Sequence, residues 1–251
     1  MLREERHSAT VVLTLDYPER RNALAMPMRE CFIEALERIE GDGSVRAIVV
    51  TGADGTFCAG GDVSGMNTNA FGDGRERFRT THRMVRLMIE GNKPIVAAVE
   101  GWAVGAGLGL ALCCDTVVAA DSAKFMTGFG KIGLIADFGL LHTLPRRVGE
   151  GRARQILLYG EQMDASAAER IGLVDHVVPA GTALDAALAQ AAKFDTAAPL
   201  PLAMTKSFLA KGLAESLDWE RNVQSTLFLT TDHVEGRDAF MAKRVPVFKG
   251  A

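Results

Sequence analysis

The sequence lacks the cysteine and histidine patterns that mark several classes of protein. Its 251 residues include 4 cysteines, of which Cys113 and Cys114 are adjacent, and this is not a disulfide framework. No CxxC or HExxH spacing occurs, and the 5 histidines are scattered along the chain. Because metal sites need clustered ligands at such spacings, we expect no metal.

The chain also lacks an excess of charge and long apolar runs. Its 28 Lys and Arg against 31 Asp and Glu give a formal net charge of −3, without the basic excess that binding to nucleic acids or anionic membranes requires. No uninterrupted apolar run reaches the length of a membrane span, and Met1–Arg6 has no apolar signal-peptide core. We therefore expect a soluble, cytoplasmic protein with neither a nucleic acid nor a membrane as partner.

Apolar residues are abundant, at 48% of the chain, and they alternate between strand-like and helix-like segments. The predicted strands and intervening helices are 11–16, 27–40 (helix), 45–51, 75–90 (helix), 94–99, 116–120 and 174–178. After Pro179 four segments look helical with no strand between them, namely 183–194, 202–213, 216–229 and 234–243. The pattern predicts an α/β core in residues 1–195 and a helical region in 196–251, whose apolar faces the core or another subunit must cover.

Two glycine-rich turns follow apolar strands. One runs from Trp102 to Leu112, without polar side chains, into an apolar helix, and the other is Ala59–Asp62. The first amides of a helix have no partner within it and lie at the positive end of its dipole, so such a turn can hold an anion or a developing oxyanion. Close helix packing is the alternative. Neither glycine spacing is a nucleotide-binding fingerprint.

Further motifs extend over nearly the whole chain. They are Arg21-Asn22-Ala23-Leu24, Val45–Gly52, Phe57–Asp62, Glu100–Gly107, Leu144–Gly149, Ala168–Val174 and Glu235–Arg244. In order and spacing they resemble the enoyl-CoA hydratase/isomerase (crotonase) family. The resemblance implies an α/β spiral of ββα units with a helical C-terminal trimerisation region, and hence a homotrimer or a dimer of trimers.

The resemblance also implies a substrate and a site. The substrate is an acyl-CoA thioester, so coenzyme A belongs to the substrate and no separate cofactor is expected. Its carbonyl oxygen would lie in an oxyanion hole formed by the amides of Gly61 and Ala106, since donors fixed in advance stabilise the enolate oxygen. The family pattern assigns Arg21, Ala23, Leu24, Phe240 and Lys243 to coenzyme A, and Met66, Gly109 and Phe129 to the acyl pocket.

Hydratases of this family use two glutamates, which are absent here because the matching positions are Gly109 and Phe129. Eight residues after Phe129 lies Asp137, the candidate acid/base. Family members with Asp at this position resemble enoyl-CoA or dienoyl-CoA isomerases, in which one carboxylate moves a proton between carbons. Alternatively, Asp137 caps a helix at 138–147.

Other activities remain open. Asp137 and Phe129 also match positions in 4-chlorobenzoyl-CoA dehalogenase of the same family, and His82 fits its basic histidine, although His82 can equally be a polar-face residue of helix 75–90. Glu100 would reach the site only if it pointed inward. The leading prediction is double-bond isomerisation with Asp137 as acid/base. The alternatives are hydration at an atypical site, dehalogenase-like hydrolysis, and acyl-CoA binding without catalysis.

Overall fold

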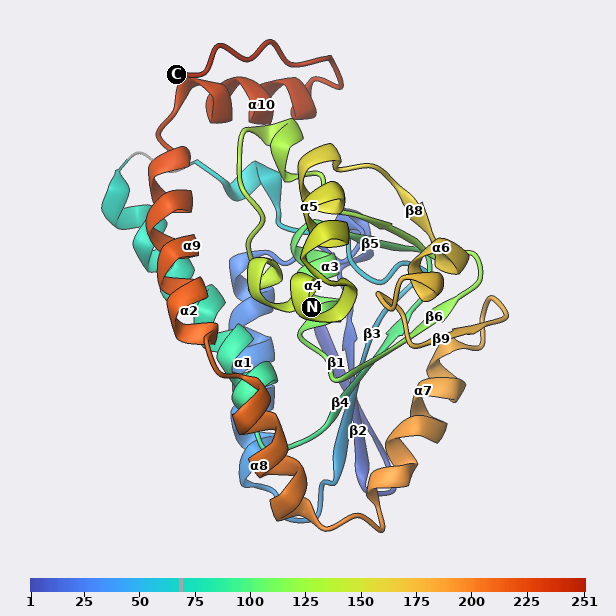
Figure 1. Cartoon of the computed structure of the whole chain (residues 1–251). Coiled ribbons are helices and arrows are strands. Elements are labelled where there is room, and N and C mark those ends of the chain that lie inside the picture. Colours follow the sequence, from blue (N-terminus) through green and yellow to red (C-terminus); the bar gives the residue numbers. More distant parts are fainter. Residues whose placement is uncertain (68–69) are drawn as a thin grey trace.

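The computed structural model describes residues 1–67 and 70–251, and a six-stranded sheet forms its centre (Figure 1). In spatial order its strands are β1 (Leu2–His7), β2 (Thr10–Leu15), β3 (Ala47–Gly52), β4 (Ile95–Val99), β6 (Thr116–Ala120) and β9 (His176–Val178). β1 is antiparallel to β2, and the other neighbours are parallel. The predicted strands are confirmed with slightly shifted ends, whereas β1 was not predicted because its sequence is polar.

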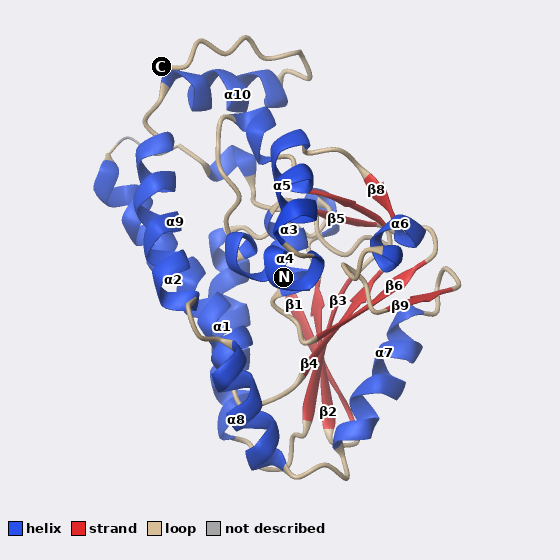
Figure 2. Cartoon of the chain, viewed as in Figure 1, coloured by secondary structure: helices blue, strands red, loops and turns tan. Residues whose placement is uncertain are grey.

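Helices cover both faces of this sheet (Figure 2). Along β2, Val11 and Leu13 belong to the larger core cluster, while Val12 belongs to a smaller cluster with Ala187. The smaller cluster lies under α7 (Ala183–Ala191). On the opposite side lie α1 (Met26–Gly41), α2 (Phe71–Glu90) and α9 (Leu213–Leu227). Parallel strands covered on both faces are almost entirely apolar, as the buried β3 and β4 are here.

A second, three-stranded sheet accompanies the glycine-rich turns. It contains β5 (Trp102–Val104), β7 (Lys124–Met126) and β8 (Met163–Asp164). Between and after these strands the chain forms α3 (Ala106–Leu112), η3 (Phe129–Ile132), α4 (Leu140–Val148), α5 (Glu150–Tyr159) and α6 (Ala165–Arg170). α3 contacts β5, and α6 contacts β7 and β8. We expected a turn leading directly into a helix after Trp102. Instead three residues first form the strand β5, because they pair in parallel with β7; Cys58 forms a further bridge to Ala103.

The C-terminal part is helical, as predicted, with η4 (Ala192–Phe194), α8 (Pro199–Leu209), α9 and α10 (Thr231–Met241). α10 packs closely on η3, because a Cβ atom on Gly236 would lie 2.7 Å from Cα of Ile132. Large apolar side chains are exposed on these helices, including Met204, Phe208 and Trp219. The boundary after residue 195 and the oligomerisation role of 196–251 stay predictions. No described helix is long and apolar enough to cross a membrane.

Candidate active site

The two glycine-rich turns are held together by backbone hydrogen bonds. The amide of Cys58 donates to the carbonyl of Trp102 at 2.8 Å, and the amide of Val104 donates to the carbonyl of Cys58 at 3.0 Å. On the other side of the same segment, the amide of Leu24 donates to the carbonyl of Gly60 at 2.7 Å. The segment before Gly61 is thus fixed from both sides.

Two glycines allow the turns to approach closely. Gly60 has a φ of 101°, and a Cβ atom there would lie 2.7 Å from the carbonyl oxygen of Val104 and 3.6 Å from the amide nitrogen of Ala106. Gly105, which precedes α3, has a φ of 54°. Both conformations are readily available to glycine alone. The sequence therefore brings two backbone segments closer than side chains would permit.

The amides of Gly61 and Ala106 have no hydrogen-bond acceptor within the part of the chain that the structure describes. Ala106 is the first residue of α3, so its N–H has no partner within the helix. Both residues line one cavity of about 110 Å³. The two amides are therefore the candidates to donate hydrogen bonds to an oxygen atom bound in this cavity.

The rest of the cavity is mainly apolar and contains a carboxyl group. Its side chains include Val63, Met66, Met126, Phe129, Ile132, Leu134, Phe240 and Asp137. Met66 and Phe129, which the resemblance assigned to the acyl pocket, and Phe240, which it assigned to coenzyme A, line the same cavity as Gly61 and Ala106. Their roles stay predictions. Among the described residues that line the cavity, Asp137 supplies the carboxylate.

Asp137 is 7% exposed and has an environment suited to proton transfer. Its Oδ2 atom lies 3.5 Å from Nε2 of Gln224, and its Oδ1 atom has no partner among the described residues. Burial, and then the charge of Glu220, raise the pKa of Asp137 from 3.8 to about 6, although the guanidinium groups of Arg29 and Arg77 act in the opposite direction. Near neutral pH this carboxyl group can therefore both accept and return a proton.

Asp137 does not cap the following helix, so the alternative interpretation of this residue is wrong. α4 begins at Leu140, and its N-cap is Gly139 in the left-handed region with a φ of 71°. Asp137 lies two residues before this N-cap. Its backbone carbonyl, not its side chain, accepts a hydrogen bond from the amide of Leu140 at 3.1 Å. Its side chain is left available to the cavity.

Comparison with known proteins places this arrangement in a family. A family model described as enoyl-CoA hydratase/isomerase matches residues 5–251. The chain belongs to this family. Among its relatives, 1,2-epoxyphenylacetyl-CoA isomerase of Escherichia coli (strain K12) is 37% identical over 248 residues, covering 96% of this chain and 95% of that protein. The 2,3-dehydroadipyl-CoA hydratase of the same strain is 36% identical over 250 residues, covering 98% and 97%.

The crotonase fold predicted from the motifs is confirmed by solved structures. The crystal structure of an enoyl-CoA hydratase from Mycobacterium avium subsp. paratuberculosis K-10 has a TM-score of 0.89 and 30% sequence identity, with coverage of 99% of this chain and 98% of that chain. The chain is thus an acyl-CoA enzyme of the enoyl-CoA hydratase/isomerase family. The names of its relatives include both isomerases and hydratases.

Gly109 does not line the cavity that contains Asp137, contrary to its sequence-based assignment to the acyl pocket. It lies in α3 and is absent from the described residues that line the cavity. A Cβ atom at Gly109 would lie 2.8 Å from Cβ of Phe138 and 3.4 Å from the carbonyl oxygen of Asp137. At the position where hydratases of this family carry a glutamate, this enzyme has Gly109, whose backbone packs against the segment that contains Asp137.

We expect Gly109→Ala to destabilise the protein by about 1–3 kcal/mol, the usual range for overpacking, and to lower turnover because the Asp137 segment must shift. Thermal unfolding and initial rates measure the two effects. Gly41→Ala is the control, since a Cβ atom at Gly41 would meet nothing within 4 Å. Equal stability and turnover of the two variants would contradict the proposed packing.

His82 does not reach the cavity, contrary to the candidate catalytic role. It lines a separate groove between α1, α2 and α9, and its Nε2 atom lies 2.8 Å from Oε1 of Glu220. Burial lowers the pKa of His82 to about 4, because a buried site disfavours the charged imidazolium. His82 is only 6% exposed, so it is not a solvated polar-face residue either. Glu100 also points elsewhere, accepting the amide of Ala183 at the start of α7.

The residues assigned to coenzyme A occupy two regions. Arg21 is exposed, and its carbonyl accepts a hydrogen bond at 3.0 Å from the amide of Ala59, at the start of the Ala59–Asp62 turn. Ala23 and Leu24 are buried, so Leu24 reaches the turn through its amide rather than its side chain. Phe240, 58% exposed, is at the edge of the cavity. Lys243 is exposed just after α10. Their contacts with coenzyme A stay predictions.

Proposed function

We propose that this enzyme moves a double bond in an enoyl- or dienoyl-CoA, with Asp137 as the acid/base. The observation that carries the proposal is the content of one cavity. A buried carboxyl group and two backbone amides, those of Gly61 and Ala106, share that cavity, and Oδ1 of the carboxyl group and both amides have no hydrogen-bond partner among the described residues. The amides serve as the oxyanion hole, and the carboxyl group transfers the proton.

The proposed reaction needs one carboxyl group. In a 3-enoyl thioester, the Asp137 carboxylate removes a proton from C2, and the electrons of the C–H bond form a dienolate with negative charge on the thioester oxygen. The Gly61 and Ala106 amides stabilise that charge, and each such donor contributes about 3 kcal/mol in comparable enzymes. The resulting carboxylic acid returns the proton to C4, so a C2=C3 double bond forms and no proton is consumed.

Hydration is the second candidate, because several relatives are named enoyl-CoA hydratases. It requires a water molecule held between an acid and a base. The two family glutamate positions are Gly109, which packs against Phe138, and Phe129, which has no proton to exchange. Dehalogenase-like hydrolysis has less support, because its basic histidine would be His82, which lies outside the cavity. One carboxyl group therefore supports isomerisation better than either alternative.

Three substrates test the proposal. Purified enzyme should convert 3-hexenoyl-CoA to 2-hexenoyl-CoA, followed by the absorbance of the conjugated thioester, while hydration of crotonyl-CoA and chloride release from 4-chlorobenzoyl-CoA stay near background. Hydration faster than isomerisation would overturn the proposal in favour of a hydratase. Chloride release would instead support the dehalogenase. Tight binding of all three thioesters without turnover would identify a non-catalytic acyl-CoA-binding protein.

The length of the acyl group is expected to depend on Phe129. Phe129 and Leu134 line both the cavity of about 110 Å³ and a neighbouring groove of about 760 Å³ along α4 and α5. They therefore form the wall between the two spaces. Phe129→Ala should join them and raise the kcat/KM ratio of 3-dodecenoyl-CoA over 3-hexenoyl-CoA about tenfold, within the range for apolar pocket discrimination.

This ratio is independent of the fraction of active enzyme, so it separates specificity from stability. Met126→Ala is the matched control, because Met126 lines the smaller cavity but not the groove. An unchanged ratio in Phe129→Ala, or an equal change in both variants, would show that Phe129 does not limit chain length.

A further inference from the structure

The segment that carries Asp137 is anchored from behind by α9. Glu220 on this helix is 1% exposed, and both of its carboxylate oxygens accept backbone amides. Oε1 accepts the amide of Phe138 and Oε2 accepts the amide of Gly139, each at 3.0 Å. These are the two residues that directly follow Asp137. Burial raises the pKa of Glu220 to about 8, while the hydrogen bonds from Gly139 and Phe138 act in the opposite direction, because they favour the carboxylate.

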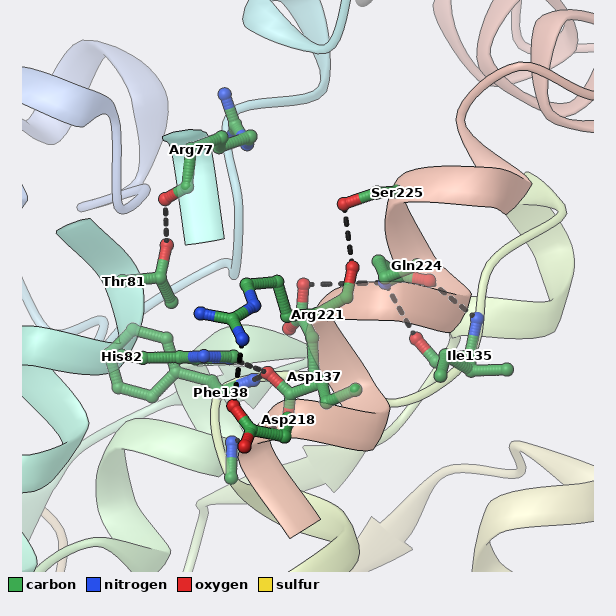
Figure 3. A network of polar contacts seen from close by, with 12 residues as sticks. Arg77, Thr81, His82, Ile135, Asp137, Phe138, Asp218, Arg221, Gln224 and Ser225 are labelled. Carbon is green, nitrogen blue, oxygen red and sulfur yellow. Dashed lines mark hydrogen bonds and ion pairs between the residues drawn. The ribbon is translucent and has the colours of Figure 1, made fainter. Parts of the chain in front are cut away.

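A second side chain of α9 anchors the segment on the other side of Asp137. Gln224, which is fully buried, lies four residues after Glu220 and therefore on the same helix face. Its Oε1 atom accepts the amide of Ile135 at 3.1 Å, and its Nε2 atom donates to the carbonyl of Ile135 at 3.0 Å. Figure 3 shows Gln224 between Ile135 and Asp137, with its contact to the Asp137 carboxylate. The segment is thus tied to one helix before and after the acid/base residue.

The backbone needs this support, because Phe138 adopts an unfavourable conformation. Its φ of 58° lies in the left-handed region, which a bulky residue seldom occupies without compensation. The ring of Phe138 is fully buried, with the guanidinium carbon of Arg29 5.8 Å from its centroid. His82 contacts Glu220 from α2, which restricts the carboxylate further. Together these contacts hold the chain in a sharp turn directly after Asp137.

We propose that Glu220 is a positioning residue of the isomerisation, which holds the Phe138–Gly139 turn so that the free Oδ1 of Asp137 stays in place to reach both C2 and C4. This inference rests on the proposed function. Glu220 is not among the described residues that line the cavity, so it acts only through the Phe138–Gly139 turn that it binds. Since proton transfer to two carbons depends on the exact location of one oxygen atom, loss of the anchor affects chemistry more than binding.

Glu220→Gln tests the inference. The amide NH₂ of glutamine cannot accept a hydrogen bond, so either Phe138 or Gly139 loses its acceptor. For 3-hexenoyl-CoA we expect kcat to fall about 100-fold, the effect of a small misplacement of a catalytic group, while KM stays within twofold. Glu215→Gln is the matched control, because Glu215 is an exposed residue of the same helix, and it should keep wild-type kcat and KM.

A double-mutant cycle with Asp137→Asn separates positioning from a purely structural role. If Glu220 acts through Asp137, adding Glu220→Gln to Asp137→Asn lowers kcat by less than twofold. Full additivity, or a rise in KM equal to the loss of kcat, would overturn the inference. Calorimetric binding of butyryl-CoA confirms that each variant keeps its site. Should Glu220→Gln not fold, Gln224→Met removes the other anchor and is judged by the same kcat loss and the same cycle.

Failure of this inference differs from failure of the proposed function. Wild-type turnover by Asp137→Asn would disprove the isomerase mechanism itself. An inactive Asp137→Asn enzyme, combined with a Glu220→Gln enzyme that behaves like Glu215→Gln, would leave the mechanism intact and disprove only the positioning role.

Discussion

Asp137→Asn is expected to inactivate the enzyme and, at neutral pH, to stabilise it. Loss of the proposed acid/base should lower kcat by about 10²–10⁴-fold, the usual contribution of such a group. In the wild type, kcat/KM should rise with pH and level off above about pH 6, because only the carboxylate can remove the C2 proton and the pKa of Asp137 is about 6.

The stabilisation follows from the same pKa. In the unfolded chain the carboxyl group ionises near 3.8, and in the folded protein near 6, so the folded state holds more protons between these values. Stability therefore falls as pH rises through this range, and the penalty is complete above pH 6 and absent below about 3.8. The difference between the two pKa values corresponds to a loss of about 3 kcal/mol in the free energy of unfolding of the wild type above pH 6. Asparagine does not ionise, so the Asp137→Asn protein avoids this loss.

Thermal unfolding at two pH values measures this effect. At pH 7.5 the Asp137→Asn protein should melt roughly 5–10 °C above the wild type, and near pH 4 the difference should vanish. Asp195→Asn, at an exposed position, should show no such gain. Substantial activity in Asp137→Asn, or a stability difference independent of pH, would contradict the assignment of Asp137 as a buried acid/base.

Ala106→Pro is expected to lower kcat by about 10²–10³-fold, the effect of removing one oxyanion-hole donor in other enzymes. Proline lacks the N–H group, and Ala106 occupies the first position of α3, where proline is tolerated because that amide has no partner in the helix. KM should rise as well, since Cδ of the proline ring replaces the hydrogen that points toward the bound oxygen.

Ala106→Gly is the matched control, because it changes the side chain and keeps the amide. Rates with 3-hexenoyl-CoA and melting temperatures of both variants separate the loss of the donor from a loss of folding. If Ala106→Pro folds and its kcat lies within tenfold of that of Ala106→Gly, the Ala106 amide does not stabilise the enolate oxygen.

The local sequence was enough to predict the layers of the fold and the two glycine-rich turns of the site. Continuous apolar segments such as Val45–Thr51 form buried parallel strands because both of their faces are covered. Glycine at positions 60 and 105 indicates backbone conformations that other residues rarely adopt, so the two turns could be predicted from residue type. The choice of the Gly61 and Ala106 amides followed from the resemblance to the family. Asp137 followed from the resemblance to the family.

Residues that act through distant contacts could not be predicted in this way. Glu220 and Gln224 are more than 80 positions from the segment they anchor, as their contacts with Phe138 and Ile135 show. One signal was available, because Leu213, Leu217, Glu220 and Gln224 recur at helical spacing, and all four are buried. A polar pair on an otherwise apolar helix face indicates a buried polar contact, but not its partner.

The sequence by itself determined the family, the α/β layers, the glycine turns and the presence of one candidate carboxylate. Only the tertiary structure decided which side chains meet. It turned His82 toward Glu220, packed Gly109 against Phe138, and placed Asp137, whose Oδ1 has no partner among the described residues, in one cavity with Gly61 and Ala106. The physical reason is that backbone conformation depends mainly on neighbouring residues, whereas burial, pKa and side-chain contacts depend on segments that only the complete fold brings together.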